Sequence, residues 1–277
     1  MTLTINTNLA SMLVQQNLSS ASEMLNGAIE RMTTGYKINH ARDNAAGHSI
    51  STDWTTKLGS IDVASQNAAM GMDMLTTMEG NIELIINHIQ RIRDLTEQAA
   101  NGTYATASRN AIKSEMDARI SEITRISSLA EYNGINLFET KAADVVLQVG
   151  IKGTTNDKIT IAKELFGGVT VSSLLGANFS TTASSATAST KLDQLDTALL
   201  TLSGKLTSIG SIQNSIESAI STLSVQSQNV TSSLSTIKDS DVASESSAYI
   251  KAQILQQASA TLLSTANQTP SIALNLI

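Results

Sequence analysis

The feature that most constrains the fold is a seam of residues spaced alternately three and four apart over positions 192–237. Twelve of its members are Leu, Ile or Val and two are polar. The seam consists of Leu192, Leu195, Leu199, Leu202, Leu206, Ile209, Gln213, Ile216, Ile220, Leu223, Ser227, Val230, Leu234 and Ile237. This spacing predicts one helix of roughly 70 Å at a rise of 1.5 Å per residue. Its 3.5-residue period predicts a left-handed supercoil against a partner helix.

The composition permits further long helices, because Pro occurs once, at Pro270, and aromatic residues make up only 3% of the chain. Apolar residues three or four positions apart recur in three further places. The three sets are Met78, Ile82, Ile85, Ile89 and Ile92; Ile112, Met116, Ile120, Ile123 and Ile126; and Val14, Leu18, Ala21, Leu25, Ala28 and Met32. We expect the first helix to stop at Asn101-Gly102 and the next to start near Ser108. The Gly-punctuated segment from Thr33 to Gly47 is expected to be a hinge or extended connector.

Between the helices the apolar period changes to two. Val145, Leu147, Val149 and Ile151 occupy every second position, and Ile159 and Ile161 resume the alternation after a turn at 153–157. This pattern predicts a β-hairpin. The expected fold is mainly α: a long antiparallel helical bundle or coiled coil formed by the N- and C-terminal segments, with a small β-hairpin region.

The pattern also suggests three domains. The expected divisions are a terminal helical domain of residues 1–44 plus 238–277, a helical bundle with the hairpin of residues 45–176 plus 190–237, and a Ser/Thr/Ala-rich linker of residues 177–189.

Both ends of the chain lack charge over long stretches, although soluble termini are usually charged and solvated. The first charged residue is Glu23, and none follows Lys251. The ends are therefore interpreted as surfaces that pair with each other and with further copies of the chain. The candidate assembly residues are Leu9, Leu13, Leu18, Leu25, Ile254, Leu255, Leu262 and Leu263.

The residues favour a structural role over catalysis. Cys is absent, the three histidines (His40, His48 and His88) are far apart, and no nucleophile-elbow, phosphate-loop or dinucleotide motif occurs. We therefore expect no enzyme, cofactor or metal site. The net charge of −6 argues against nucleic acid as a partner. The first residues lack a basic and then apolar leader pattern, and no stretch has the roughly 18 apolar residues that span a bilayer, so neither signal peptide nor membrane insertion is expected.

Motifs in order along the chain resemble those of bacterial flagellin. The resemblance covers about 1–165 and 190–277. The motifs are residues 5–8 (INTN), 30–39 (ERMTTGYKIN), 43–47 (DNAAG), 90–95 (QRIRDL), 132–137 (YNGINL), 251–254 (KAQI) and 266–270 (ANQTP), with Asp241, Ala243 and Glu245. The resemblance implies a short form without a large outer domain, in which paired terminal helices form the inner tube of a secreted, extracellular filament used for motility. It also implies type III export as an unfolded chain, with an export chaperone and a cap protein as partners.

The resemblance further implies a mid-helix surface that contacts other subunits or Toll-like receptor 5. The matching residues are Gln90, Arg91, Leu95 and Glu115, and we expect Arg91 to lie beside an exposed Leu95, with Glu115 on an antiparallel neighbouring helix. Two alternatives are a hook–filament junction protein, which shares similar terminal helices, and a secreted translocator or effector with amphipathic ends. The second would need basic residues beside the apolar faces, and these are missing.

Overall fold

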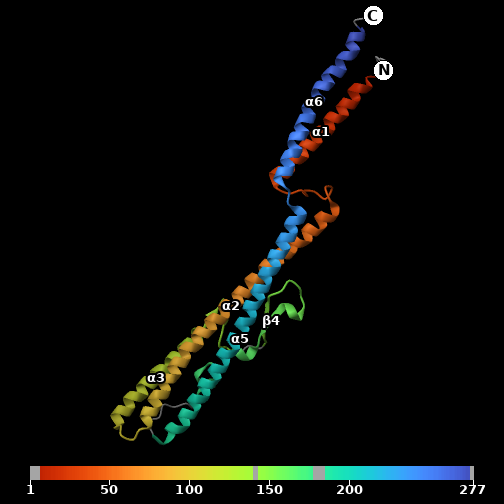
Figure 1. Ribbon diagram of the computed structural model, residues 1–277. Helices are drawn as coiled ribbons and strands as arrows, with labels where there is room; N and C mark the ends of the chain where they lie inside the picture. The colour runs from red at the N-terminus through yellow and green to blue at the C-terminus, as the bar shows by residue number, and fades with distance from the viewer. Residues whose placement is uncertain (1–6, 140–142, 177–184, 275–277) are drawn as a thin grey trace. The chain divides into compact units, whose positions relative to one another are not determined.

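The computed structural model describes residues 7–139, 143–176 and 185–274, and it is built from long helices with two small antiparallel sheets. The helices are α1 (Leu9–Thr34), α2 (Ala45–Ala100), α3 (Thr106–Leu129), α4 (Val171–Leu174), α5 (Ser185–Lys238) and α6 (Val242–Leu274). The strands are β1 (Glu131–Tyr132), β2 (Ile135–Asn136), β3 (Val145–Gln148) and β4 (Lys158–Ile161), with 3₁₀ turns η1 (Thr155–Asp157) and η2 (Lys163–Leu165). The predicted fold class is confirmed (Figure 1).

The chain divides into two compact units that are described separately. The terminal unit comprises Met1–Leu58 with Gln228–Ile277, and the central unit comprises Gly59–Ser227. These divisions fall inside α2 and α5, whereas the expected domain limits at 44 and 238 coincide with helix ends. The three-part division therefore stays a prediction. Of the predicted linker, residues 177–184 lie outside the described residues, and residues 185–189 begin α5.

The central unit is organised by the predicted seams of α2 and α5. Arg93 bonds Asp196 and Gln213 bonds Glu79, so residue numbers rise along one helix as they fall along the other, and the helices are antiparallel. Every member of the α5 seam is buried or half-buried. Those spaced by seven, Leu195, Leu202, Ile209, Ile216 and Leu223, are almost completely buried. The seven-residue spacing of these buried side chains is the pattern on which the predicted supercoil rests, and the supercoil itself stays a prediction.

Helix α3 and the β3–β4 hairpin complete the core of the central unit. Met116, Ile123 and Ile126 of α3 and Ile161 of β4 belong to the same buried cluster as the α2 and α5 seams. The strands pair antiparallel, with Leu147 opposite Ile159, as the alternation predicted. Lys205 of α5 holds the segment after β4, because its Nζ donates to the carbonyl oxygens of Glu164 and Leu165 at 2.6 and 3.0 Å. Burial lowers the pKa of Lys205.

A second hairpin, β1–β2, was not predicted. Its two-residue turn is Asn133-Gly134, and both residues have positive φ, 49° and 78°. That geometry matches the twist of a tight hairpin and is strained for most side chains, which is why Asn-Gly favours it. The Asn-Gly pair was therefore a usable signal, although strands of two residues are too short to show an alternating pattern.

The terminal unit contains α1 and α6, which lie side by side in Figure 1 with both chain ends at the same end of the pair. Asn8 caps α1 by accepting from the backbone N–H of Ser11, and Gly35 ends it at φ 74°. Asp241 caps α6 by accepting from the backbone N–H of Ala243. Polar caps of this kind satisfy N–H groups that have no partner within the helix. Residues 35–44 are not helical, so a connector lies where it was predicted, but it is shorter than the expected Thr33–Gly47 because α1 continues to Thr34 and α2 begins at Ala45.

Replacing Ile85 with Ala is expected to destabilise the central unit by about 2–5 kcal/mol, because the side chain is fully buried and the core cannot close the cavity completely. The neighbouring Leu84 is 51% exposed, so Leu84→Ala should change the free energy of unfolding by no more than about 0.5 kcal/mol. Thermal unfolding followed by circular dichroism compares the two. Equal losses from both substitutions would contradict the assignment of the seam.

Candidate subunit interface

Helices α1 and α6 are joined by polar contacts along the whole pair. Asn8 Nδ2 donates to the carbonyl oxygen of Ala266 at 2.8 Å, and Gln256 Nε2 donates to Ser22 Oγ at 3.1 Å. At the other end, Arg31 Nε lies 2.9 Å from Glu245 Oε1. The two numbers in each pair sum to nearly the same value, so the helices are antiparallel in one continuous register.

The fully buried residues at the contact between α1 and α6 are small. They are Ala21 and Ala28 on α1 and Ala252 and Ser259 on α6. The predicted α1 seam is confirmed, since its other members, Val14, Leu18, Leu25 and Met32, are half-buried. Burying a methylene contributes about 0.8 kcal/mol, so alanines supply much less free energy than the Ile and Leu of the central seams. The pair is therefore weakly held by its own contact.

The larger apolar side chains of the pair point outward instead. On α1, Leu9 is 75% and Leu13 59% exposed, and on α6, Ile254 and Leu262 are 59% and 57% exposed. Exposed large apolar residues on the same two helices also include Met12, Met24, Ile29, Ile250 and Leu255. Concentrated apolar exposure of this kind marks a surface for protein contact.

The eight candidate assembly residues consequently fall into two groups. Leu18, Leu25 and Leu263 are half-buried at the α1–α6 contact. The exposed group faces away from that contact and consists of Leu9, Leu13, Ile254, Leu255 and Leu262. The first group can hold one copy together, whereas the second is available to another copy.

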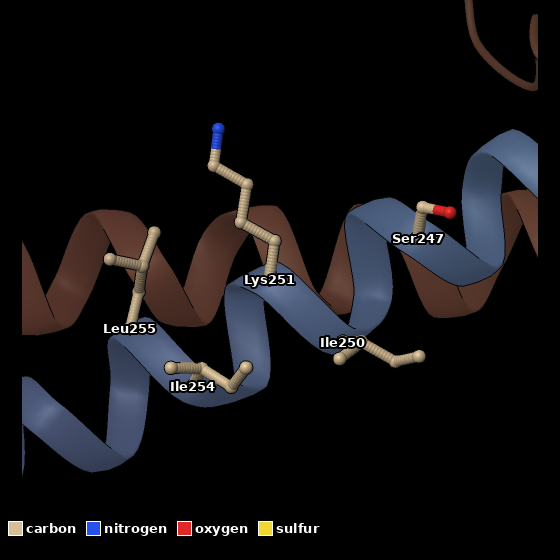
Figure 2. A pocket seen from close by; sticks show the side chains of 5 residues that line it. All are labelled: Ser247, Ile250, Lys251, Ile254 and Leu255. Atoms are coloured by element: carbon tan, nitrogen blue, oxygen red, sulfur yellow. The ribbon is translucent and has the colours of Figure 1, made fainter.

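Part of the outward surface of α6 forms a shallow apolar groove. It is lined by Ser247, Ile250, Lys251, Ile254 and Leu255 (Figure 2). Figure 2 shows Lys251 extending away from the helix on the same side as Leu255. The groove therefore presents three branched apolar side chains beside one ammonium group.

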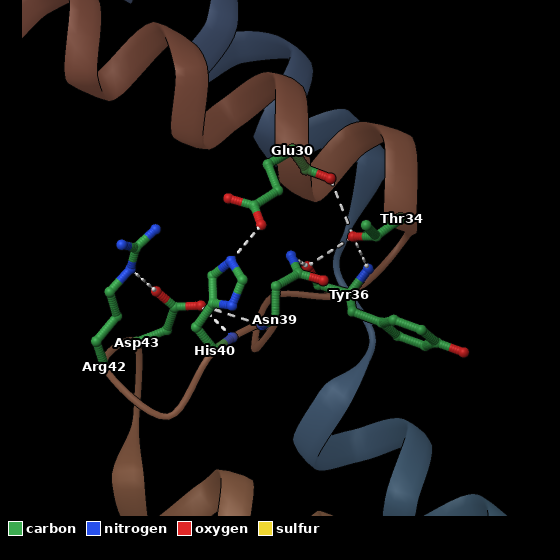
Figure 3. A network of polar contacts seen from close by, with 7 residues as sticks. All are labelled: Glu30, Thr34, Tyr36, Asn39, His40, Arg42 and Asp43. Carbon is green, nitrogen blue, oxygen red and sulfur yellow. Dashed lines mark hydrogen bonds and ion pairs between the residues drawn. The ribbon is translucent and has the colours of Figure 1, made fainter.

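The connector beside the helix pair is ordered by local polar contacts (Figure 3). Asp43 Oδ2 accepts from the backbone N–H groups of Asn39 and His40 at 3.1 and 2.8 Å, and these bonds lower the pKa of Asp43. His40 Nε2 lies 2.8 Å from Glu30 Oε1, which ties the connector to α1. The segment is thus an organised bend.

The bend is also attached to the start of α6. Tyr36 and Asp239 form an antiparallel bridge, and the backbone N–H of Ser240 donates to the carbonyl oxygen of Gly35 at 2.8 Å. Lys238 lies 4.2 Å from the centre of the Tyr36 ring. The segment between α1 and α2 and the segment between α5 and α6 therefore lie side by side in the terminal unit.

The predicted contact surface on α2 and α3 is only partly assembled as expected. Gln90 and Arg91 are exposed, and Arg91 Nε lies 2.9 Å from Glu115 Oε1, which confirms that Glu115 lies on a neighbouring helix. The expectation of an exposed Leu95 is wrong, because Leu95 is 1% exposed and belongs to the core. Helix α2 packs against both α3 and α5, so its buried face is wider than one seam.

No cluster of three or more potential metal-ligating His, Cys, Asp or Glu residues occurs in the part of the chain that the structure describes. His88 is half-buried on α2, and burial together with the nearby Arg119 lowers its pKa. Among the described helices, none combines the length and apolar character needed to cross a membrane.

The fold and its exposed helix pair are those of a helical structural protein that assembles with copies of itself. Family profiles agree: the bacterial flagellin N-terminal helical region matches residues 5–143, and the bacterial flagellin C-terminal helical region matches residues 192–277. The chain belongs to the bacterial flagellin family and is a structural subunit of the bacterial flagellar filament.

Individual relatives support this assignment over the full length. The flagellin of Listeria innocua is 30% identical and the flagellin of Xenorhabdus nematophila is 32% identical, and each alignment covers at least 98% of both chains. The crystal structure of Bacillus cereus flagellin superposes with a TM-score of 0.51 at 25% identity, covering 57% of this chain and 88% of that one. A putative flagellar hook-associated protein from Vibrio parahaemolyticus has a TM-score of 0.60 at 16% identity, covering 71% of this chain and 100% of that one. This last likeness shows a shared fold only.

Replacing Arg91 with Gln is expected to raise the pKa of Glu115. The hydrogen bond from Arg91, and then its charge and that of Arg119, hold this pKa below the ordinary carboxyl value. A folded-state pKa below the unfolded one means that the pair stabilises the fold above the ordinary carboxyl range and loses this effect as pH falls through the lowered value. Carboxylate titration by NMR measures the shift.

The matched control for this measurement is Glu122, whose pKa is lowered chiefly by a hydrogen bond from Arg125. Its titration should be unchanged in Arg91→Gln. An unchanged Glu115 titration would show that the Arg91–Glu115 bond does not persist in solution.

Proposed function

We propose that the α1–α6 pair makes the polymer-forming contacts of the inner filament and that the central unit forms a surrounding layer. The observation that carries this proposal is the placement of large apolar side chains on the outside of a nearly charge-free helix pair. A surface of this kind gains free energy only when another apolar surface covers it. Neighbouring copies of the same pair supply that surface.

The composition of the pair also supports export as an unfolded chain followed by assembly outside the cell. Isolated helices are marginally stable in water, and a contact whose fully buried residues are Ala and Ser adds less to them than buried Ile and Leu would. The pair should therefore open easily in a single copy and become stable when neighbours cover its outer faces. An export chaperone and a cap protein fit this cycle, because an exposed apolar helix pair needs protection before assembly and guidance at the growing end.

Leu262→Asp is expected to abolish filament formation. Leu262 is 57% exposed in one copy, so the change leaves the fold of that copy intact, but a carboxylate on a covered surface must lose its hydration. The loss recurs at each subunit added. Filament formation is measured by sedimentation and electron microscopy after seeding.

The matched control is Leu200→Asp on α5 of the central unit, where Leu200 is 75% exposed. It should polymerise, and both variants should keep the thermal unfolding of the central helices. Normal filaments from Leu262→Asp would exclude a covered position for this residue and would count against the proposed role of the pair.

We also propose that the α2–α3 surface around Arg91 is recognised by Toll-like receptor 5 when the chain is monomeric. Gln90, Arg91 and Glu115 are accessible there, and the Arg91–Glu115 bond fixes a guanidinium at the surface, where Arg is favoured as an interface anchor. Leu95 can act only indirectly, by supporting the helix beneath Arg91, because its side chain is buried.

The receptor proposal predicts that wild-type monomer activates a cell reporter and that Arg91→Ala loses most of this activity. Truncating a central Arg anchor commonly costs at least about 2 kcal/mol of binding free energy, roughly thirtyfold in affinity. Arg125→Ala is the matched control, since Arg125 is an exposed Arg paired with Glu122 on α3. The proposal of a receptor site at Arg91 would be contradicted if the wild-type monomer did not activate the reporter, or if wild type and Arg91→Ala activated it equally.

A further inference from the structure

The two helices of the terminal pair carry very few charged side chains. Residues 7–29 contain one charged side chain, Glu23, and residues 246–274 contain one, Lys251. Both are exposed, and neither takes part in an ion pair within the described residues. The next charges along the helices are already partnered, Arg31 with Glu245 and Glu30 with His40. One carboxylate and one ammonium group therefore remain.

The positions of these two groups prevent them from meeting across the α1–α6 contact. Glu23 is two residues from both Ala21 and Leu25, which places it about 200° around α1 from the contact at 100° per residue. It shares the outward face with Leu9 and Met12, which are 75% and 59% exposed. Each charge thus lies on a different outer surface of the same copy.

The two charges lie in different surroundings. Lys251 lines the α6 groove with Ile250, Ile254 and Leu255 (Figure 2). Glu23 shares its face with Met12 and has the 51% exposed Met24 beside it, but the residues one turn away are small or polar: Ser19, Ser20, Asn26 and Gly27. An apolar groove with one positive group is complementary in charge to a face of mostly small side chains with one negative group.

Covering these surfaces in a polymer would remove water from both charges. An ion that loses water without gaining a partner costs several kcal/mol, so a covered carboxylate and a covered ammonium group need opposite charges nearby. We infer that Glu23 of one copy forms an ion pair with Lys251 of a neighbouring copy, with the outer face of α1 seated in the α6 groove. The inference rests on the proposed role of the α1–α6 pair in polymerisation, and it names the contact that fixes the register between copies.

Charge reversal tests the contact in the full-length chain. Glu23→Lys and Lys251→Glu should each raise the critical concentration for seeded polymerisation at low salt by roughly tenfold or more, because like charges then meet in a covered contact. An equimolar mixture of the two variants should polymerise at nearly the wild-type concentration. If the two variants alternate along the polymer, residue 23 of each copy faces an opposite charge at residue 251 of its neighbour.

The double variant Glu23→Lys/Lys251→Glu should also polymerise, because every contact is restored with reversed polarity. The control is Glu217→Lys on α5, an exposed residue in the central unit, which changes the net charge by the same amount as Glu23→Lys and should have little effect. Circular dichroism should show wild-type unfolding for all variants, since both charges are exposed in one copy.

The mixture decides between contacts within and between copies. Rescue by the double variant without rescue by the mixture would place the pair inside one copy and overturn the inference. The inference would also be overturned if both single variants polymerised like the wild type. It would be overturned as well if neither the mixture nor the double variant polymerised, and Lys251 would then be assigned to another partner such as a chaperone. In these cases polymerisation through Leu262 would still stand. Failure of the wild-type chain to polymerise would remove the proposed function and this contact together.

Discussion

The structure depends on one constraint, the seven-residue repeat that keeps a narrow apolar seam facing its partner along α2 and α5. Buried Ile and Leu side chains at this spacing each contribute about 1.5–3 kcal/mol when they leave water, and the central unit contains many of them. The polar partners follow from the register that the seam imposes. Arg93 meets Asp196, and Gln213 meets Glu79, only because the apolar residues have fixed how the helices lie.

The terminal pair obeys the same geometry with the opposite distribution of side-chain size. In the central seams, large apolar residues lie inside and charged residues lie outside. In α1 and α6, the fully buried residues are alanine and serine, larger residues such as Leu18 and Leu25 are half-buried, and further large apolar residues lie outside. The helical period alone does not distinguish these cases, since both have residues repeating every three and four positions. The sizes of the buried residues determine whether a pair is stable by itself or needs neighbours.

The seams, helix breaks and β3–β4 hairpin could be predicted from sequence because each depends on local spacing or on Gly and Asn. What spacing could not supply was the number of neighbours around each helix. Leu95 was expected at the surface because it is four residues from Arg91, yet α3 and α5 together cover a wider arc of α2. Likewise, Leu262 and Leu263 are adjacent and chemically identical. Only the position of α1 shows that Leu263 is half-buried at the contact and that Leu262 is exposed.

The organised bend in the terminal unit separates the contact between α1 and α6, whose fully buried residues are small, from the seams of α2 and α5, whose buried residues are large. A seam that continued unbroken through α1 into α2 would have to keep one face and one helical phase throughout. Residues 35–44 interrupt one passage, residues 239–241 interrupt the other, and the Tyr36–Asp239 bridge holds both interruptions at the same level. The helices on each side of the bend can therefore bury different faces. The bend itself is held by polar contacts within the terminal unit, such as the hydrogen bonds that Asp43 accepts from the backbone N–H groups of Asn39 and His40.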